Sequence, residues 1–126
     1  ATLVVREKLM THGWQKAESK FKVDLNGADS SANVISRSVA KGESEQTFIS
    51  HLNGNNRCAG HTECDGIIMD HAKVNAVPSL SANDLDASLI HEAAIGKIAG
   101  EQLIKLMTLG LTEAEAEEQI VNGFLK

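Results

Sequence analysis

The sequence predicts a mainly β fold that ends in a short helical segment. Over most of the chain, short segments alternate apolar with polar residues, as in residues 20–25, and no helical period competes with them. From about Gly100 onward, the apolar residues take up helical spacing instead. We therefore expect a β region over residues 1–98 and a helical segment over residues 99–126.

Seven segments have the character of strands, and turn residues separate them. The pairs Asn26-Gly27 and Asn53-Gly54 fall at two of these breaks, where they could close hairpins or turn the corners of a solenoid. On strand spacing alone, an antiparallel sandwich and a β-solenoid are equally compatible with the sequence. The expected strands are Thr2–Leu9, Lys20–Leu25, Asn33–Ala40, Thr47–Leu52, Glu63–Met69, Lys73–Leu80 and Ser88–Ile95.

Two helices are expected, near Gly100–Leu109 and Glu113–Leu125. Gly110 is well placed to end the first, and Thr112 followed by Glu115 forms a capping box for the second. A helical hairpin of this kind could simply cover the open end of the β structure. The apolar faces are expected to comprise Leu103, Ile104, Leu106 and Met107 in the first helix, and Ala116, Ile120, Val121 and Phe124 in the second.

The composition excludes several classes of partner. The net charge is −5, aromatic residues make up 3% of the chain, and the 12 basic residues are scattered, so nucleic acid is not an expected partner. No apolar segment is long enough for a membrane span, and two cysteines are too few for a disulfide framework. We expect a soluble cytoplasmic protein with reduced thiols. Its start at Ala1, within an apparent strand, is consistent with a fragment of a longer protein.

Both cysteines lie in one stretch, with a histidine midway between them. Cys58, His61 and Cys64 form a pattern of the ligand types that zinc and iron–sulfur centres use. Alternate residues of a strand point to opposite faces, so His61 and Cys64 would diverge unless a turn intervenes. The structural alternative places Cys58 in a loop and makes Cys64 a small buried residue.

A second unusual pair, His91 and Glu92, stands in an otherwise apolar segment. Adjacent strand residues face opposite sides, so only one of the two can point inward beside another buried group. A structural histidine is the alternative to a functional one. His12, His51 and His71 belong to no constellation and are interpreted as surface or structural residues. No H-E-x-x-H or equivalent pair supports a zinc hydrolase.

Several stretches of the second half resemble the SufB/SufD family of iron–sulfur cluster assembly proteins. Cys64-Asp65 is similar to the family's Cys-Asp dipeptide, and His91-Glu92-Ala93 with Gly96-Lys97-Ile98 is similar to the stretch before its helices. The resemblance is dense from Cys64 to Phe124. In the helical region it is carried by Gly100-Glu101-Gln102-Leu103, Gly110-Leu111-Thr112-Glu113-Ala114-Glu115-Ala116 and Ile120-Val121-Asn122-Gly123-Phe124.

The resemblance implies a right-handed parallel β-helix followed by two helices, and so favours the solenoid. It also implies that Cys64, Glu92 and His91 help to hold a transient iron–sulfur cluster where two β-helices pair, with Cys58 and His61 as weaker candidate ligands. The partner would be a second copy or another SufB/SufD-like chain. The C-terminal helices would dock a SufC-like ABC ATPase, through positions facing away from the two apolar faces.

Two functions therefore compete. The first is a scaffold or assembly factor for iron–sulfur clusters, which works as a dimer and is not an enzyme in the usual sense. The second is an interaction module that docks the ATPase, in which Cys64 and His91 only pack.

Overall fold

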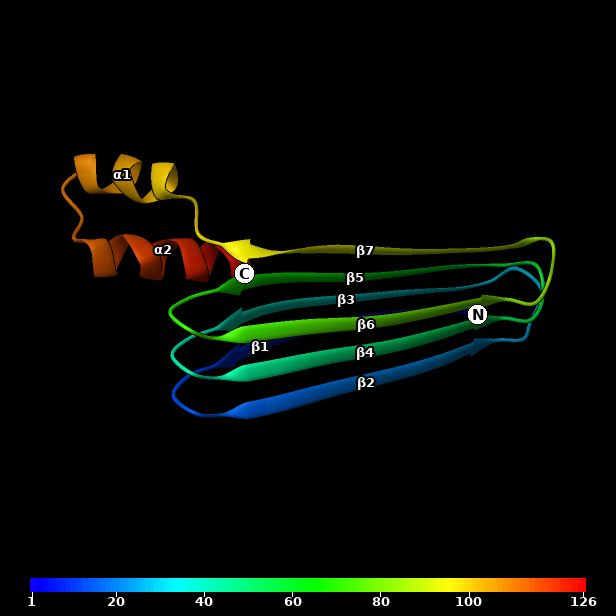
Figure 1. Cartoon of the computed structure of the whole chain (residues 1–126). Helices are drawn as coiled ribbons and strands as arrows, with labels where there is room; N and C mark the ends of the chain where they lie inside the picture. The colour runs from blue at the N-terminus through cyan, green and yellow to red at the C-terminus, as the bar shows by residue number, and fades with distance from the viewer.

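The computed structural model describes all 126 residues as a parallel β-solenoid of about three turns followed by two helices (Figure 1). Successive strands alternate between a four-stranded sheet, ordered β1-β3-β5-β7, and a three-stranded sheet, ordered β2-β4-β6. Every strand pair is parallel, which confirms the solenoid and excludes the sandwich. The strands are β1 (Thr2–Thr11), β2 (Lys16–Leu25), β3 (Ser30–Ala40), β4 (Glu45–Gly54), β5 (Cys58–Ile68), β6 (Lys73–Ala82) and β7 (Ala87–Lys97).

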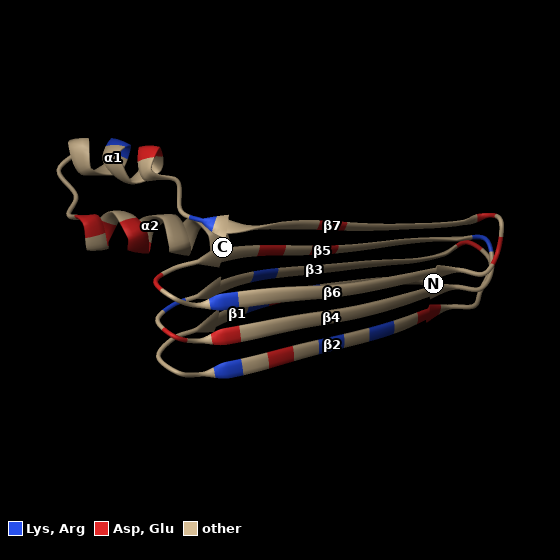
Figure 2. Cartoon of the chain, viewed as in Figure 1, with Lys and Arg blue, Asp and Glu red and all other residues tan.

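The side chains alternate between the interior and the two outer faces. Charged residues recur along the outer face of β2, as Figure 2 shows, while its partly buried residues, among them Phe21 and Val23, point inward. Two small apolar clusters fill the interior. One is built on Leu25, Ala32 and Cys58, and the other on Val34, Phe48 and Cys64.

One Asn-Gly pair turns a corner and the other does not. Asn26-Gly27 lies in the connection between β2 and β3, whereas Asn53-Gly54 forms the last two residues of β4, so the expectation of a turn there was wrong. Gly54 faces inward, where an added Cβ would lie 2.8 Å from the Cβ of Ala87 and 3.1 Å from Sγ of Cys58. Close packing between coils explains this glycine, and turn geometry does not.

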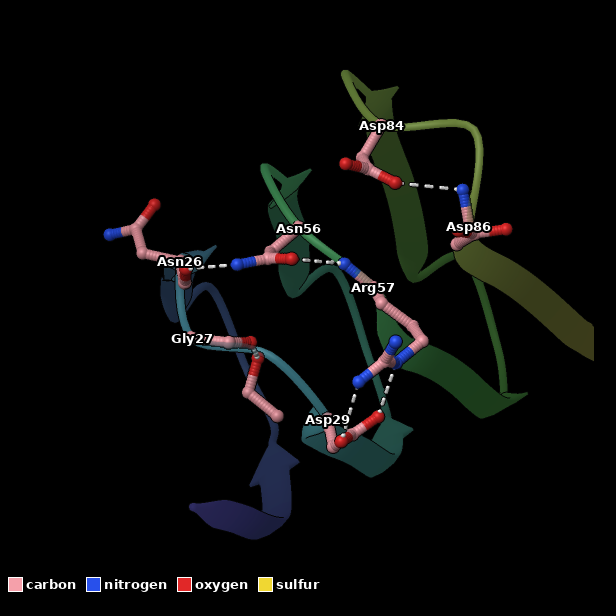
Figure 3. A network of polar contacts seen from close by, with 8 residues as sticks. Asn26, Gly27, Asp29, Asn56, Arg57, Asp84 and Asp86 are labelled. Carbon is pink, nitrogen blue, oxygen red and sulfur yellow. Dashed lines mark hydrogen bonds and ion pairs between the residues drawn. The ribbon is translucent and has the colours of Figure 1, made fainter.

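Polar side chains stack along one row of corners. Asn83 donates to Asn55, and Asn55 donates to Asn26, each bond 2.7 Å long. Beside them, Arg57 binds the carboxylate of Asp29 through two hydrogen bonds of 2.7 and 3.0 Å (Figure 3). These contacts join residues 28 or 29 positions apart and hold successive coils in register.

The helices are α1 (Gly100–Thr108) and α2 (Glu113–Leu125). The capping box is confirmed: Thr112 Oγ1 accepts from the Glu115 amide, and the Glu115 carboxylate accepts from the Thr112 amide. Ala116 and Val121 of α2 are buried, and α2 contacts β3. Neither helix is long and apolar enough to cross a membrane.

The apolar face of α1 departs from expectation. Leu103 and Leu106 are half-buried, but Ile104 is 64% and Met107 is 43% exposed. The expected apolar face of α1 is therefore only partly covered within the chain. The helices lie beyond the strand ends, so they leave the edges of β6 and β7 open (Figure 1).

Candidate functional site

Cys64 lies inside the solenoid, on β5. It is 1% exposed and packs in the cluster with Val34 and Phe48. Burial, and then the negative charges of Asp65 and Glu7, raise the pKa of its thiol to about 11. The thiol of the isolated chain is therefore protonated at neutral pH, and it must lose its proton to bind a metal.

A half-buried carboxylate, Glu7, accompanies this thiol. Glu7, Ser36 and Cys64 occupy the same register on three neighbouring strands. Glu7 accepts hydrogen bonds from Ser36, at 2.9 Å, and from Ser19, at 2.8 and 3.0 Å. A hollow of about 10 Å³ touches Glu7, Ser36 and Cys64, which is close to the space that one water molecule needs. Sequence reasoning missed Glu7; its signal was a carboxylate at the inward position between Val5 and Leu9.

His91 also points into the solenoid, from β7. Its Nδ1 lies 2.6 Å from Oγ1 of Thr62, its register partner on β5. Its Nε2 is buried and has no hydrogen-bonding partner within the chain. Burial, and then the charge of His61, lower the pKa of His91, so the ring is neutral at physiological pH. A neutral imidazole with one free nitrogen is the form that binds metals.

Glu92 lies on the opposite face of the sheet from Cys64. Its Oε2 is 3.5 Å from Nε2 of His61, whose Nδ1 lies 2.8 Å from Oδ1 of Asn33. Glu63 is the register partner of Glu92. Burial raises the pKa of Glu63, and the charges of Asp65 and Glu92 add to the shift. His61 and Glu92 thus share an outer polar row, apart from the buried thiol.

Cys58 is remote from Cys64. Both face inward on β5, six residues apart, so the strand rise separates them by roughly 20 Å. Cys58 is 6% exposed and packs with Leu25 and Ala32 in the apolar cluster near one end of the solenoid. Within the chain, no three histidine, cysteine or acidic side chains are arranged to hold a metal ion. Among the expected ligands, Cys58, Cys64 and His91 face the interior, and Cys64 and His91 lie only two register positions apart on neighbouring strands.

The chain is thus a parallel β-solenoid with a terminal helical pair, and its neighbouring strands β5 and β7 carry a buried thiol and a buried imidazole nitrogen without a partner. The chain matches the family described as "SUF system FeS cluster assembly, SufBD core domain" over residues 1–124. It belongs to the SufBD family of iron–sulfur cluster assembly proteins, so the expected family is confirmed.

Relatives from archaea and bacteria support this assignment. The chain is 42% identical over 106 residues to an "Iron-sulfur cluster assembly SufBD family protein" of Methanothermobacter thermautotrophicus, covering 82% of this chain and 26% of the relative. The chain is 34% identical over 128 residues to a protein of the same description from Archaeoglobus fulgidus, and the match covers 100% of this chain and 34% of the relative. It is 32% identical over 102 residues to the "Iron-sulfur cluster assembly protein SufB" of Bacillus subtilis, and the match covers 78% of this chain and 22% of the relative. The chain thus spans about a quarter to a third of these relatives.

Proposed function

We propose that this chain is a non-enzymatic scaffold for the assembly of iron–sulfur clusters. The observation that carries the proposal is the placement of Cys64 and His91 on the interior face of β5 and β7, with the free Nε2 of His91 inside. A thiolate and an imidazole nitrogen are cluster ligands, and the imidazole holds iron less tightly than a second thiolate would. Weaker ligation suits a protein that must release its product.

One chain supplies too few ligands, so a second copy or a paralogous chain completes the site. β7 is one of the two edge strands of the four-stranded sheet and contains no proline, whereas β6, the edge of the three-stranded sheet at the same end of the solenoid, contains Pro78, which lacks an amide hydrogen. A partner strand therefore adds more readily along β7. A twofold axis perpendicular to the sheet there would set the two His91 side chains on one face of the joined sheet and the two Glu92 side chains on the other.

The helical segment is the docking surface for a SufC-like ABC ATPase. Ile104, Met107 and Leu109 are 64%, 43% and 79% exposed and have no covering element in the chain. This apolar surface of α1 differs from the location expected from the sequence, which lay on the opposite helical faces. Glu117 and Glu118 of α2 offer a second, charged contact.

Anaerobic reconstitution with iron and sulfide tests the cluster site. Cys64→Ser is expected to abolish the visible absorbance of the reconstituted protein, because the cluster loses its thiolate. Cys58→Ser is the matched control, since it changes the other buried thiol at a distance of roughly 20 Å. Full absorbance in Cys64→Ser, with loss in Cys58→Ser, would show that the other cysteine is the ligand. Circular dichroism checks that both variants stay folded.

An interaction module without a cluster is the second candidate. The near-complete burial of Cys64 and the absence of a metal-binding arrangement within one chain favour it. This candidate predicts ATPase binding with no reconstituted absorbance in either the wild type or the variants. Light scattering adds a further criterion, because a scaffold completed by a second copy should be a dimer at micromolar concentration. Both candidates place the protein in a reducing compartment such as the cytoplasm, where its two free cysteines stay reduced.

A further inference from the structure

A basic cavity lies on the outer face of the four-stranded sheet, away from the thiol site. It measures about 160 Å³ and is lined by Arg6, Glu7, Lys8, Ile35, Arg37 and Lys126. The wall of the cavity combines β1 and β3 with Lys126, which follows α2, and α2 contacts β3. Figure 2 marks a basic segment on β3 and the C-terminal end of the chain at the same end of the sheet.

The cationic side chains around this cavity have no anionic partners. None of the four lies within 4.0 Å of a carboxylate oxygen, although the chain as a whole carries a net charge of −5. Asp65 is the register partner of Arg37 on β5, yet it makes no ion pair with it. The unpaired cations are therefore available to a ligand.

Two of these cationic side chains, Lys8 and Arg37, also repel one another when no anion lies between them. Lys8 and Arg37 are register partners on β1 and β3, and both are exposed. Like charges directly opposite one another on a sheet repel, so a bound anion would relieve a cost that the fold otherwise bears.

The one carboxylate among the lining residues faces elsewhere. The oxygens of Glu7 accept hydrogen bonds from Ser19 and Ser36 inside the solenoid. Glu7 thus contributes to the cavity wall without neutralising the cations in it. Arg6 and Arg37 can each offer paired N–H groups to the oxygens of one anion, which is the geometry that suits phosphate.

We infer that this cavity binds the phosphate chain of a small molecule, with Arg6, Lys8 and Arg37 as its ligands. Its volume of about 160 Å³ leaves room for a group larger than a single small ion, such as a diphosphate. Ile35 is the one apolar residue of the lining and no aromatic ring is present, so the cavity offers no aromatic surface on which a base could stack. The diphosphate group is the recognised chemistry, whether it comes from inorganic pyrophosphate or from a nucleotide.

Isothermal titration of the 126-residue chain with pyrophosphate, ADP and citrate tests the inference. Pyrophosphate and ADP are expected to bind with similar affinity, and citrate much more weakly. The affinity should fall as salt is raised. Arg37→Gln and Lys8→Gln should each weaken pyrophosphate binding about tenfold or more.

Lys22→Gln is the matched control, since it removes the same charge from an exposed position on β2 without touching the cavity. It should leave the pyrophosphate affinity unchanged. The inference is overturned if pyrophosphate does not bind, if citrate binds as well as pyrophosphate, or if Lys22→Gln weakens binding as much as Lys8→Gln. Cluster reconstitution in Arg37→Gln should match the wild type, which separates this site from the proposed scaffold function.

Discussion

Thr62 Oγ1 and His91 Nδ1 lie 2.6 Å apart inside the solenoid, on neighbouring strands and 29 residues apart in the chain. Thr62 is completely buried, so its hydroxyl has no access to water. This bond engages one nitrogen of the imidazole and directs the other, Nε2, into the interior without a partner. A threonine from the preceding coil thereby orients the proposed histidine ligand, as hydrogen bonds behind metal ligands commonly do.

Thr62→Val should destabilise the chain by about 1–3 kcal/mol, because it keeps the side-chain shape but leaves His91 Nδ1 buried and unpaired. Chemical denaturation measures this loss. Thr47→Val is the control, since Thr47 faces outward on β4, and its effect should stay within about 0.5 kcal/mol. If His91 is a cluster ligand, Thr62→Val should also lower the yield of reconstituted cluster. An unchanged yield would mean that the hydroxyl does not position the ligand.

Glu63 gives the chain a stability that depends on pH. Burial and neighbouring carboxylates raise its pKa in the folded state above the ordinary value of 4.5. The folded state thus holds the proton of Glu63 more tightly than the unfolded state does. The stabilising contribution of this protonated carboxyl is present below the ordinary pKa and is lost as pH rises through the pKa of the folded state.

Glu63→Gln should therefore stabilise the chain at pH 7, and its advantage over the wild type should shrink as pH falls toward 4.5. Urea midpoints measured at several pH values test this. Glu43→Gln, an exposed change in the turn between β3 and β4, should show no such trend. A stability advantage of Glu63→Gln that grows as the pH falls would mean that folding lowers the pKa of Glu63 instead of raising it.

Gly54→Ala should destabilise the solenoid by about 1–3 kcal/mol, because the new methyl group would meet Ala87 Cβ at 2.8 Å. Ala87 cannot swing away, since its Cβ is fixed to the backbone of β7. Gly27→Ala is the matched control, with no atom within 4 Å of the added Cβ. Denaturant unfolding should place this control within about 0.5 kcal/mol of the wild type. Equal effects of the two substitutions would show that the inter-coil contact is not tight.

Local pattern predicted the elements better than their assembly. Alternation located all seven strands, and the capping box at Thr112 located α2 within the chain. The choice between sandwich and solenoid depends on pairing between residues 28 or 29 apart, such as Ser30 with Cys58, and alternation carries no information about it. The pair Asn53-Gly54 was interpreted as a turn because the inward packing of Gly54 against the next coil cannot be recognised from the sequence.

In the candidate site too, the sequence predicted features within one strand but not the contacts between coils. Strand alternation correctly indicated that His91 and Glu92 diverge, with one of them on the side of Cys64. It could not reveal Glu7 or Thr62, because they reach Cys64 and His91 from other coils. Helical spacing likewise identified the apolar residues of α1 but not which of them lack a covering element.

Ile104→Lys should weaken the binding of a SufC-like ATPase about tenfold or more without lowering thermal stability. The side chain is 64% exposed, so the lysine removes apolar contact area from the proposed interface but little from the folded chain. A pull-down with purified ATPase measures the effect. Val77→Lys is the matched control, because Val77 is 51% exposed on β6, away from the helices.

Reversal of Glu117 and Glu118 to lysine separates the two possible contacts on the helical segment. Charged positions at the rim of an interface contribute less than a buried apolar centre, so this double reversal should weaken binding less than Ile104→Lys does. If the reversal abolishes binding while Ile104→Lys leaves it intact, the ATPase contacts the acidic side of α2. The exposed surface of Ile104, Met107 and Leu109 would then require a different partner.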